Sequence, residues 1–449
     1  MKRTWSDNLR LFMLMTLCSF VLVSSCGKKE GGATNTASDA ISENITDPVT
    51  IDFWQFWTDP TARPIVEKLV ADFHKQNPLV TVNLTDLTWE NGREKIVIAL
   101  ASGSGPDLME LGSDWVPEFA GSGRVADLSK NFADSKGEYI GWEPVTSGDK
   151  VYGAPWILGT RALFYNTDLL RRAGYSDSID NGRGGLPYKI DDFKNLVFRV
   201  DALGKDIYGW GSNAAEKNRL YKKFLPFFWS YGASFYSEND DYCVISSMKA
   251  INALKLYQVL NDSCGYVETQ RRIEDAFLDG KIGVILSGDW LIKRIKTERP
   301  NFHYVTGVFP GLKVNGQSFL GGEYLCVNAQ SSSVEKAAAV KLAKFFLSPQ
   351  SQVEFCKGNF STGPASLEAA KDSFFTSDLN ILTFVKQLRL SKAPPFEPTW
   401  ARMQEEFERA VERTLFEGVA PAQALYDARN AIQKISRPAD SLGAEDPAT

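Results

Sequence analysis

Hydrophobic and polar positions predict an alternation of strands and helices along the body of the chain. Residues 50–57 alternate and then become densely apolar, which is typical of a buried strand. Segment 64–76 begins with proline and has one apolar face, so it predicts a helix. A strand over 80–84, a helix over 92–102 and a strand over 107–111 follow. This order predicts a parallel sheet covered by helices, with ligands bound at the carboxyl ends of its strands.

The second half of the chain carries similar signals. Residues 277–286 read as a helix end, a turn and a strand. Ser332 and Glu335 have the spacing of a capping box, and Pro349 stands where the first residue of another helix would be. One further helical stripe lies near the C-terminus, at Met403, Phe407, Val411 and Leu415. We expect these stripes to pack into cores.

The N-terminal segment predicts export. Basic residues precede an apolar run over 11–23, which is shorter than the roughly 20 residues that cross a bilayer as a helix. The segment ends in LVSSC, which resembles a bacterial lipobox with Cys26 as the lipidated residue. Polar, small residues follow to position 48 and predict a flexible tether. We therefore expect an exported protein, periplasmic or at the cell surface, anchored to the membrane through Cys26. A soluble secreted protein with an incidental cysteine is the alternative.

Composition narrows the chemistry. The chain of 449 residues has a net charge of −5, which argues against a nucleic-acid-binding surface. It has only two histidines, so it offers little for histidine-based metal sites or general-base catalysis. It also has eleven tryptophans, an unusually large number. Phosphate-loop, zinc-protease and nucleophile-elbow motifs are absent from the sequence. We expect no cofactor and no metal. Besides Cys18 and Cys26 there are four cysteines; Cys243 and Cys264 are the favoured disulfide pair, and free buried thiols are the alternative.

Several tryptophans stand beside carboxylates at the expected ends of strands. Trp57 and Asp59, Asp114 and Trp115, and Asp289 and Trp290 are such pairs. A ring offers an apolar face and a carboxylate accepts hydrogen bonds, the combination that a sugar needs. Two carboxylates facing one glycosidic bond would instead make a glycosidase, and the sequence leaves that alternative open.

Four stretches in order resemble the extracellular solute-binding proteins of maltose and oligosaccharide ABC importers. They are ALASGSGPDLMEL (99–111) with FAGSGRVADL (119–128), KVYGAPW (150–156) with ALFYNTDLL (162–170), DAFLDGKIGVILSGDW (275–290), and FLGGEYLCVN (319–328) with FFLSP (345–349). The resemblance covers roughly residues 49–435. Segments 176–185 and 237–267 match none of the motifs and are candidate insertions near the pocket.

The resemblance implies an α/β fold of two lobes, the type II periplasmic-binding-protein-like fold, with a hinge that the chain crosses more than once. Crossings are expected near 157–160, near 307–310 and after 327–328. The boundaries we expect are 1–25 for the signal peptide, 26–48 for the tether, 49–157 and 309–329 for the first lobe, 158–308 and 330–436 for the second lobe, and 437–449 for a polar tail.

The resemblance also implies a ligand site in the cleft between the lobes. Ring stacking is expected from Trp57, Trp115, Trp156, Trp229, Trp290 and Trp400. Hydroxyl groups would be bound by Asp59, Asp114, Asp289 and Glu323. Backbone or side-chain contacts are expected from Ser102, Gly103, Tyr165 and Gly322, the last because the pair Gly321 and Gly322 lets the backbone approach a ligand.

The expected function is therefore a non-enzymatic, monomeric receptor that captures a sugar or oligosaccharide and delivers it to the membrane subunits of an ABC permease. Alternatives are a polyol, glycerophosphodiester or peptide as solute, a secreted glycoside hydrolase, or an adhesin. A phosphate-bearing solute would require cleft arginines, for which Arg93 and Arg161 are the candidates.

Overall fold

The computed structural model describes residues 40–175, 185–215, 220–237 and 242–436. The expected signal peptide, Cys26, most of the tether and the expected tail lie outside these residues, as does segment 176–184. Within the described ranges, every helix is too short or too polar to span a bilayer.

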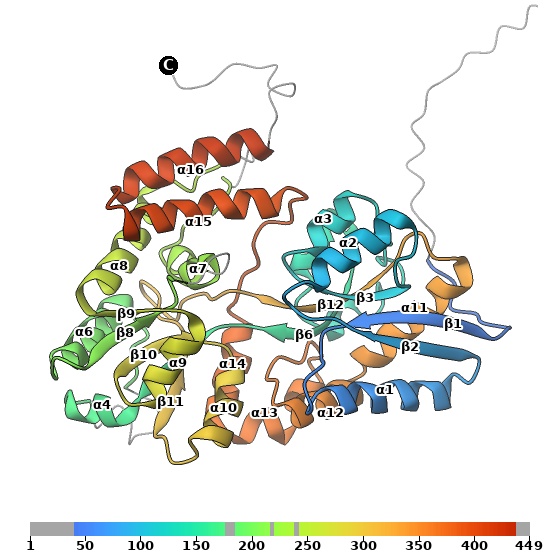
Figure 1. The fold of residues 1–449 in the computed structure, drawn as a ribbon, viewed down its shortest axis with the longest axis horizontal. Coiled ribbons are helices and arrows are strands. Elements are labelled where there is room, and N and C mark those ends of the chain that lie inside the picture. The colour runs from blue at the N-terminus through green and yellow to red at the C-terminus, as the bar shows by residue number, and fades with distance from the viewer. Residues whose placement is uncertain (1–39, 176–184, 216–219, 238–241, 437–449) are drawn as a thin grey trace, which may run out of the picture. The chain divides into compact units, whose positions relative to one another are not determined.

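The first of two five-stranded sheets is built from the predicted strand–helix alternation. Its strand order is β2 (Val80–Asp86), β1 (Val49–Gln55), β3 (Leu108–Gly112), β12 (Gly321–Val327) and β6 (Ala154–Gly159). Strands β1, β2 and β3 are parallel because α1 (Arg63–Gln76) and α2 (Gly92–Ser102) connect them, whereas β12 runs antiparallel to both β3 and β6. Figure 1 labels these strands. A separate pair, β4 (Thr146–Ser147) and β5 (Lys150–Val151), forms a small hairpin.

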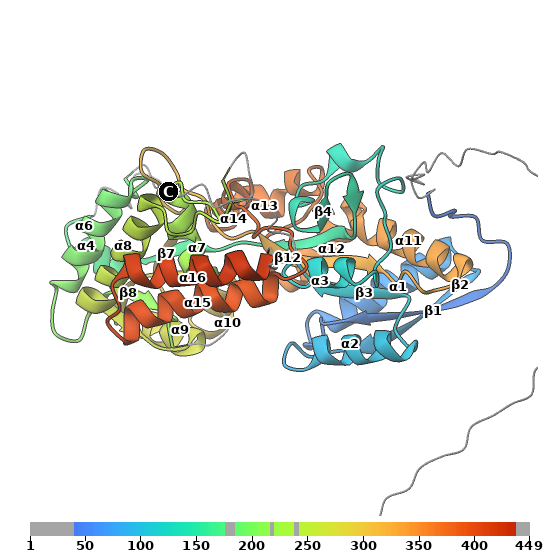
Figure 2. The ribbon, with the colours of Figure 1, turned by 90° about the horizontal axis from the view of Figure 1, so that it is seen from above.

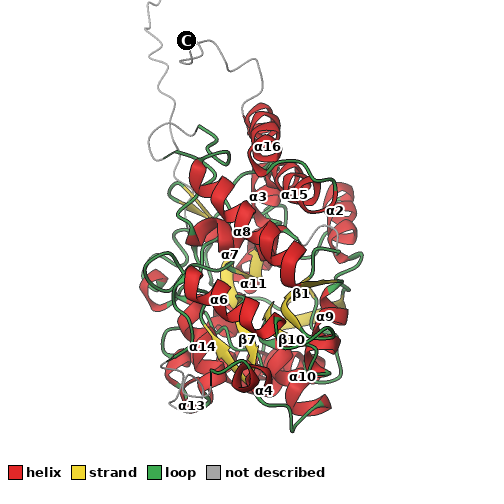
Figure 3. Ribbon diagram, turned by 90° about the vertical axis from the view of Figure 1, so that its left-hand side faces the viewer, coloured by secondary structure: helices red, strands yellow, loops and turns green. Residues whose placement is uncertain are grey.

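The second sheet has the order β11 (Tyr304–Gly307), β7 (Ala162–Asn166), β10 (Ile282–Ser287), β8 (Tyr208–Ser212) and β9 (Gly265–Val267). Strand β10 is buried along its whole length, as its apolar run predicts. In Figure 3 the helices surround the strands. The helices that follow in this part of the chain are α4 (Thr167–Arg172), α6 (Ile190–Asp201), α7 (Tyr221–Ser230), α8 (Met248–Cys264), α9 (Gln270–Leu278) and α10 (Trp290–Glu298).

Several helices begin where local sequence signals predict them to begin. Pro64 stands in the first turn of α1, and the Ser332–Glu335 capping box opens α11 (Ser333–Leu347). Pro349 is the first residue of α12 (Pro349–Asn359). The last helices are α13 (Ser373–Ser377), α14 (Leu379–Leu388), α15 (Trp400–Phe416) and α16 (Pro421–Ser436). The short helix α3 spans Val116–Gly121. Short 3₁₀ turns lie at Lys136–Glu138, Glu143–Val145 and Ala369–Lys371.

The chain passes between the two sheets repeatedly. It leaves the first sheet at Gly159 and enters the second at Ala162, and it returns between Gly307 and Gly321. The third passage differs from the expectation, because α11 packs on β1, β6 and β12 of the first sheet. Only after α12 does the chain reach α14, which packs on β11 and β7. Segment 330–436 is thus shared between the lobes, and its assignment to the second lobe is wrong for α11 and α12.

Helices α15 and α16 lie side by side and pack on α7 and α8 (Figures 1 and 2). Segment 242–267 is also part of this packing, since α8 contacts α7, β8 and α16 and contributes to the second hydrophobic core. It is therefore a structural element of the second lobe. The cysteines of the described residues are free and buried, so the expected Cys243–Cys264 disulfide is wrong. Burial raises the pKa of the Cys243 thiol to about 11 and that of Cys264 to about 12.

Candidate functional site

A pocket of about 180 Å³ lies where the two sheets face each other. It takes residues from the carboxyl ends of strands of both sheets, which is where the strand order predicted a ligand. The lining residues are Trp57, Trp89, Gly112, Ser113, Asp114, Ile157, Leu158, Gly159, Arg161, Lys222, Asp289, Trp290, Phe319, Gly321, Gly322, Glu323 and Ser361. Six of the predicted site residues are among them: Trp57, Asp114, Asp289, Trp290, Gly322 and Glu323.

Larger cavities lie elsewhere, one of about 910 Å³ beside α6. Among the described residues, that cavity is lined by a single carboxylate, Asp192, and its rings come from Tyr175, Tyr188 and Phe198. The smaller pocket instead brings together several tryptophans, carboxylates and cations. Convergent polar groups on a partly apolar wall are typical of ligand sites, so we take the smaller pocket as the candidate site.

Two tryptophans of the pocket, Trp57 and Trp89, pack against other rings. Trp57 packs edge-on against Phe355, with ring centroids 4.9 Å apart, and against Trp156 at 6.3 Å. Trp89 stacks on Phe56 at 4.3 Å and lies 5.6 Å from Trp115. These contacts hold Trp57 and Trp89 in place and leave Trp89 45% exposed. Trp290 is 40% exposed.

Asp114 links the two lobes. It follows β3 in the first lobe, and its Oδ2 accepts hydrogen bonds at 3.0 Å from both the Tyr221 hydroxyl and the Lys222 Nζ, which belong to α7. Burial raises the pKa of Asp114, but the Lys222 ammonium outweighs it and keeps the pKa below its ordinary value. Asp114 is therefore ionised and paired at neutral pH.

Asp289 and Glu323 are the less easily ionised carboxylic acids of the pocket. Burial raises the pKa of Asp289, although hydrogen bonds from the Thr362 amide (2.6 Å) and hydroxyl (2.9 Å) oppose the shift. Burial and the nearby Asp289 charge raise the pKa of Glu323 to about 8. Glu110, one strand away on β3, is completely buried, and burial together with Glu323 raises its pKa well above the ordinary value. Glu323 is thus mainly protonated at pH 7.

Arg161 supplies the second cation of the pocket. Its guanidinium lies 4.6 Å from the centroid of the Trp290 ring and 5.9 Å from that of Phe319, at cation–π distance. Arg93, the other candidate for a phosphate-bearing solute, is instead ion-paired with Glu118. Among the described residues no group of three or more His, Cys, Asp and Glu side chains has the arrangement of a metal site.

Four predicted aromatic contacts are wrong in this structure. Trp156 and Tyr165 are 0% exposed, Trp400 is 1% exposed and Trp229 is 5% exposed. Trp156 packs on Phe346 and Phe355, and the other three belong to the second core. The tertiary packing of the elements that carry these rings turns them into the hydrophobic cores.

The remaining predicted contacts also lie outside the lining. Ser102 and Gly103 end α2, and a helix between parallel strands ends at the amino edge of the sheet, opposite the pocket. Trp115 stands behind Trp89. Asp59 accepts hydrogen bonds from Thr61 and from the Ala62 amide. Burial raises the pKa of Asp59, but these bonds and Lys293 outweigh it and lower the pKa.

Gly322 lines the pocket for a different reason than predicted. Its backbone has φ +135, and a Cβ there would lie 2.4 Å from the Ile157 carbonyl oxygen of the neighbouring strand β6. The glycine is required by the close approach of β12 and β6. Glu323, the next residue, lies near the start of β12 and lines the pocket.

Sequence reasoning missed Trp89, Lys222 and Phe319 as lining residues. Trp57 is the last residue of the predicted strand 50–57, and Trp89 comes shortly after the predicted strand 80–84, so a tryptophan near the end of a strand was an available signal. Lys222 and Phe319 reach the pocket through the packing of α7 and of the segment before β12, and only the tertiary structure reveals them.

Two α/β lobes with a ring- and carboxylate-lined pocket between them define a solute-binding protein. The chain belongs to the bacterial extracellular solute-binding protein family, whose profile matches residues 57–353. This confirms the resemblance to the receptors of ABC importers and the two-lobed fold.

Individual relatives agree with this assignment. A putative binding protein of Brucella abortus (strain 2308) is 25% identical over 374 residues, 81% of this chain and 88% of its own length. The sugar-binding protein MalE of Xanthomonas citri is 26% identical, with a TM-score of 0.76 over 86% of this chain and 97% of that chain. UgpB of Mycobacterium tuberculosis, solved with glycerophosphocholine, shares the fold at 18% identity, with a TM-score of 0.72 over 87% of this chain and 98% of that chain.

Proposed function

We propose that the protein is a membrane-anchored receptor for a neutral sugar or short oligosaccharide, which it binds in the pocket between the lobes without chemical change and delivers to an ABC permease. The observation that carries this proposal is the meeting of Trp57, Trp89 and Trp290 with Asp114, Asp289 and Glu323 in one pocket. Rings bind the C–H face of a sugar, and carboxyl groups bind its hydroxyls.

The charges of the pocket favour a neutral solute. Lys222 is neutralised by Asp114 at 3.0 Å, and Glu323 carries little charge at pH 7 because its pKa is about 8. Arg161 and Asp289 lie in the same pocket, and the Arg161 charge favours the ionised form of Asp289. A solute with a net charge would add a charge that the groups of the pocket do not balance, and a buried charge without a partner is costly.

The volume favours a small solute. Sites for drug-sized ligands measure about 300–1,000 Å³, and this pocket measures about 180 Å³. We therefore propose a solute of one or two sugar rings for this arrangement of the lobes. The sugar-binding protein of Xanthomonas citri supports sugar as the class of solute.

A glycerophosphodiester is the second candidate, because Arg161 and Lys222 both line the pocket and UgpB of the same fold is solved with glycerophosphocholine. To bind a phosphate, Lys222 would have to break its hydrogen bond to Asp114 and donate to the phosphate instead.

A thermal-shift screen of the mature chain distinguishes these solutes. The panel contains mono- and disaccharides, polyols, short peptides and glycerophosphocholine, and chromatography of each mixture detects any hydrolysed product. We expect stabilisation by a neutral mono- or disaccharide that is recovered intact. Stabilisation by glycerophosphocholine alone supports the second candidate, and hydrolysis of a glycoside would establish an enzyme instead.

Anchoring is tested separately. Lipidation at Cys26 predicts that the wild-type protein, expressed in its bacterial host, incorporates labelled fatty acid and sediments with membranes. Cys26→Ala should incorporate none. Equal labelling of both proteins contradicts the anchor without affecting the solute proposal.

A further inference from the structure

The Trp290 ring is half exposed, yet it is held in one orientation by a hydrogen bond from behind. Its indole Nε1 donates to the Glu274 Oε1 at 2.9 Å. The ring belongs to the first turn of α10, and Glu274 lies in α9 on the other side of the pocket wall. An indole N–H that is removed from water usually has a hydrogen-bond partner, and here the partner is a buried carboxylate.

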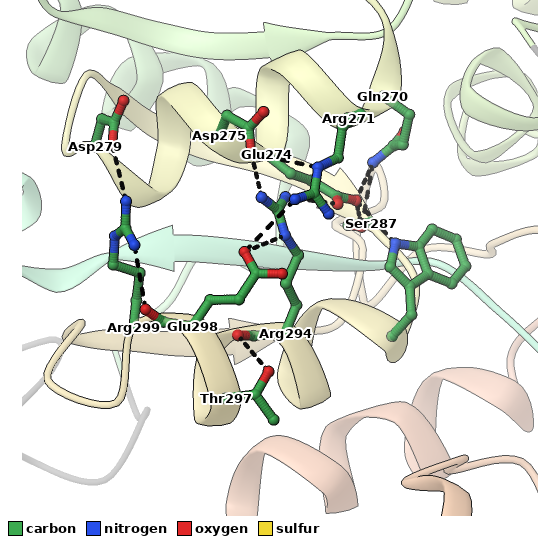
Figure 4. Close-up of polar contacts among 11 residues, drawn as sticks. Gln270, Arg271, Glu274, Asp275, Asp279, Ser287, Arg294, Thr297, Glu298 and Arg299 are labelled. Carbon is green, nitrogen blue, oxygen red and sulfur yellow. Dashed lines mark hydrogen bonds and ion pairs between the residues drawn. The ribbon is translucent and has the colours of Figure 1, made fainter. Parts of the chain in front are cut away.

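Glu274 is itself fixed by a dense set of donors (Figure 4). Its side chain is 4% exposed. The oxygen that binds Trp290 also accepts from the Gln270 Nε2 at 2.6 Å and the Ser287 Oγ at 2.8 Å, while the other oxygen accepts from the Arg294 Nη1 at 3.3 Å. A buried carboxylate with this many donors has one rotamer available to it.

The ion pairs around Arg294 complete the support. Arg294 is 9% exposed and bridges three carboxylates, those of Glu274, Asp275 and Glu298. Trp290 and Arg294 are four residues apart on α10, as Gln270 and Glu274 are on α9, so one face of each helix supplies the contacts. The two helices are thereby joined at the base of the ring.

Gly288 fixes the same ring from another direction. A Cβ at this position would lie 1.9 Å from the Cζ3 atom of Trp290, so the benzo edge of the indole rests directly on the glycine backbone. With the pyrrole nitrogen held by Glu274 and the benzo edge against Gly288, the ring has little freedom to turn.

We infer that Glu274 is a positioning residue for solute binding: it holds the indole of Trp290 so that the ring stands in the pocket wall, next to Arg161. This inference rests on the proposed function, because it assigns a role to a residue that lies behind the pocket and touches no solute. Because the ring is already ordered in the free protein, a sugar binds to a preformed surface and less conformational entropy is lost on binding.

The test compares variants that differ in the contact with Trp290. Glu274→Met keeps the length of the side chain but removes the acceptor, and Glu274→Gln retains an acceptor oxygen. Asp275→Asn is the matched control, because Asp275 pairs with the same Arg294 but not with Trp290. Trp290→Phe keeps a ring that has no N–H to donate.

The first measurement needs no solute. Hydrogen exchange of the Trp290 indole N–H, followed by nuclear magnetic resonance and assigned through the loss of its signal in Trp290→Phe, should be slow in the wild type, in Glu274→Gln and in Asp275→Asn. It should be fast in Glu274→Met. Equal exchange rates in the wild type and Glu274→Met would overturn the inference.

The second measurement is the dissociation constant for maltose, determined by calorimetry. Loss of one hydrogen bond predicts an affinity about three- to tenfold lower for Glu274→Met, with little change in Asp275→Asn. In the Trp290→Phe background the same Glu274→Met change should have no further effect. An equal loss in both backgrounds would mean that Glu274 acts on the fold and not through Trp290. If maltose does not bind the wild type, the solute proposal fails for this sugar, and the exchange rates alone decide the role of Glu274.

Discussion

The carboxylic acid of Glu323 couples the pocket to pH. Its pKa of about 8 in the folded protein lies above the ordinary value of 4.5, so folding binds its proton more tightly. The resulting stability is complete below pH 4.5 and is lost as the pH rises toward 8. One pKa unit corresponds to about 1.4 kcal/mol, so the loss amounts to a few kcal/mol.

Glu323→Gln should therefore unfold at a higher urea concentration than the wild type at pH 9 and at nearly the same concentration at pH 4. The measurement is urea unfolding of the sugar-free protein at several pH values. Glu405→Gln, at an exposed glutamate of α15, is the control and should show no such divergence. Parallel curves for Glu323→Gln and the wild type between pH 4 and 9 would contradict the assignment.

Trp57 lines the pocket and Trp400 lies in a core, so substituting each should affect a different property, the affinity for sugar or the free energy of unfolding. Trp57→Ala removes a ring of the pocket and should weaken sugar binding by about 1–3 kcal/mol, the scale of a buried large side chain. Trp400→Ala removes a core ring and should lower the free energy of unfolding by about 3–5 kcal/mol, with the affinity of the folded protein nearly unchanged. Calorimetric titration and urea unfolding of both variants check this pair. A larger affinity loss for Trp400→Ala than for Trp57→Ala would contradict the lining described above.

The residue scale is also where sequence reasoning was weakest. A tryptophan beside a turn residue looks the same in sequence whether the ring faces a pocket, as Trp290 does, or a core, as Trp400 does. The direction of a side chain at the end of an element depends on what packs there. Lys222 shows the same limit, since its contact with Asp114 joins residues 108 positions apart.

At the scale of single elements, local signals predicted the structure well because the forces are local. The capping box at α11 is made within four residues: the Ser332 Oγ accepts from the Glu335 amide at 3.3 Å, and Glu335 accepts from the Ser332 amide at 2.7 Å. The starts of helices α1 and α12, at Pro64 and Pro349, follow from the geometry of proline. Which sheet α11 covers is a non-local question, and there the predicted boundary was wrong.

Ser332→Ala should lower the free energy of unfolding by about 1 kcal/mol, the usual effect of losing an N-cap. Because α11 packs on β1, β6 and β12, the loss should appear in the unfolding of the first lobe. Ser333→Ala, at the exposed next residue, is the control and should be nearly neutral. Urea unfolding measures both, and equal effects would argue against the capping box.

At the scale of the whole described fold, side chains from the two lobes bind each other around the pocket. Besides Asp114 and Lys222, the Lys293 Nζ of α10 bonds to the Thr61 hydroxyl at 3.0 Å and to the Asn359 Oδ1 at 3.2 Å, both on the side of the first sheet. Such contacts hold lobes together when a hinged protein closes.

Lys293→Ala should favour an open arrangement and raise the radius of gyration measured by small-angle X-ray scattering without sugar. Thr297→Ala is the matched control, because Thr297 is exposed on the same helix and its hydroxyl donates to carbonyl oxygens of α10 itself, those of Lys293 at 3.0 Å and Arg294 at 3.2 Å. An unchanged radius for Lys293→Ala, or the same change in both variants, would contradict a role of Lys293 in holding the lobes.

The central claim is that the pocket between the sheets binds a neutral sugar. Its most direct test is a crystal structure of the protein with the sugar that stabilises it most. We predict a sugar ring stacked on Trp57 or Trp290, with hydroxyl groups within hydrogen-bond distance of Asp114, Asp289 or Glu323. A sugar bound elsewhere, for example in the cavity beside α6, with this pocket left to solvent, would contradict the claim.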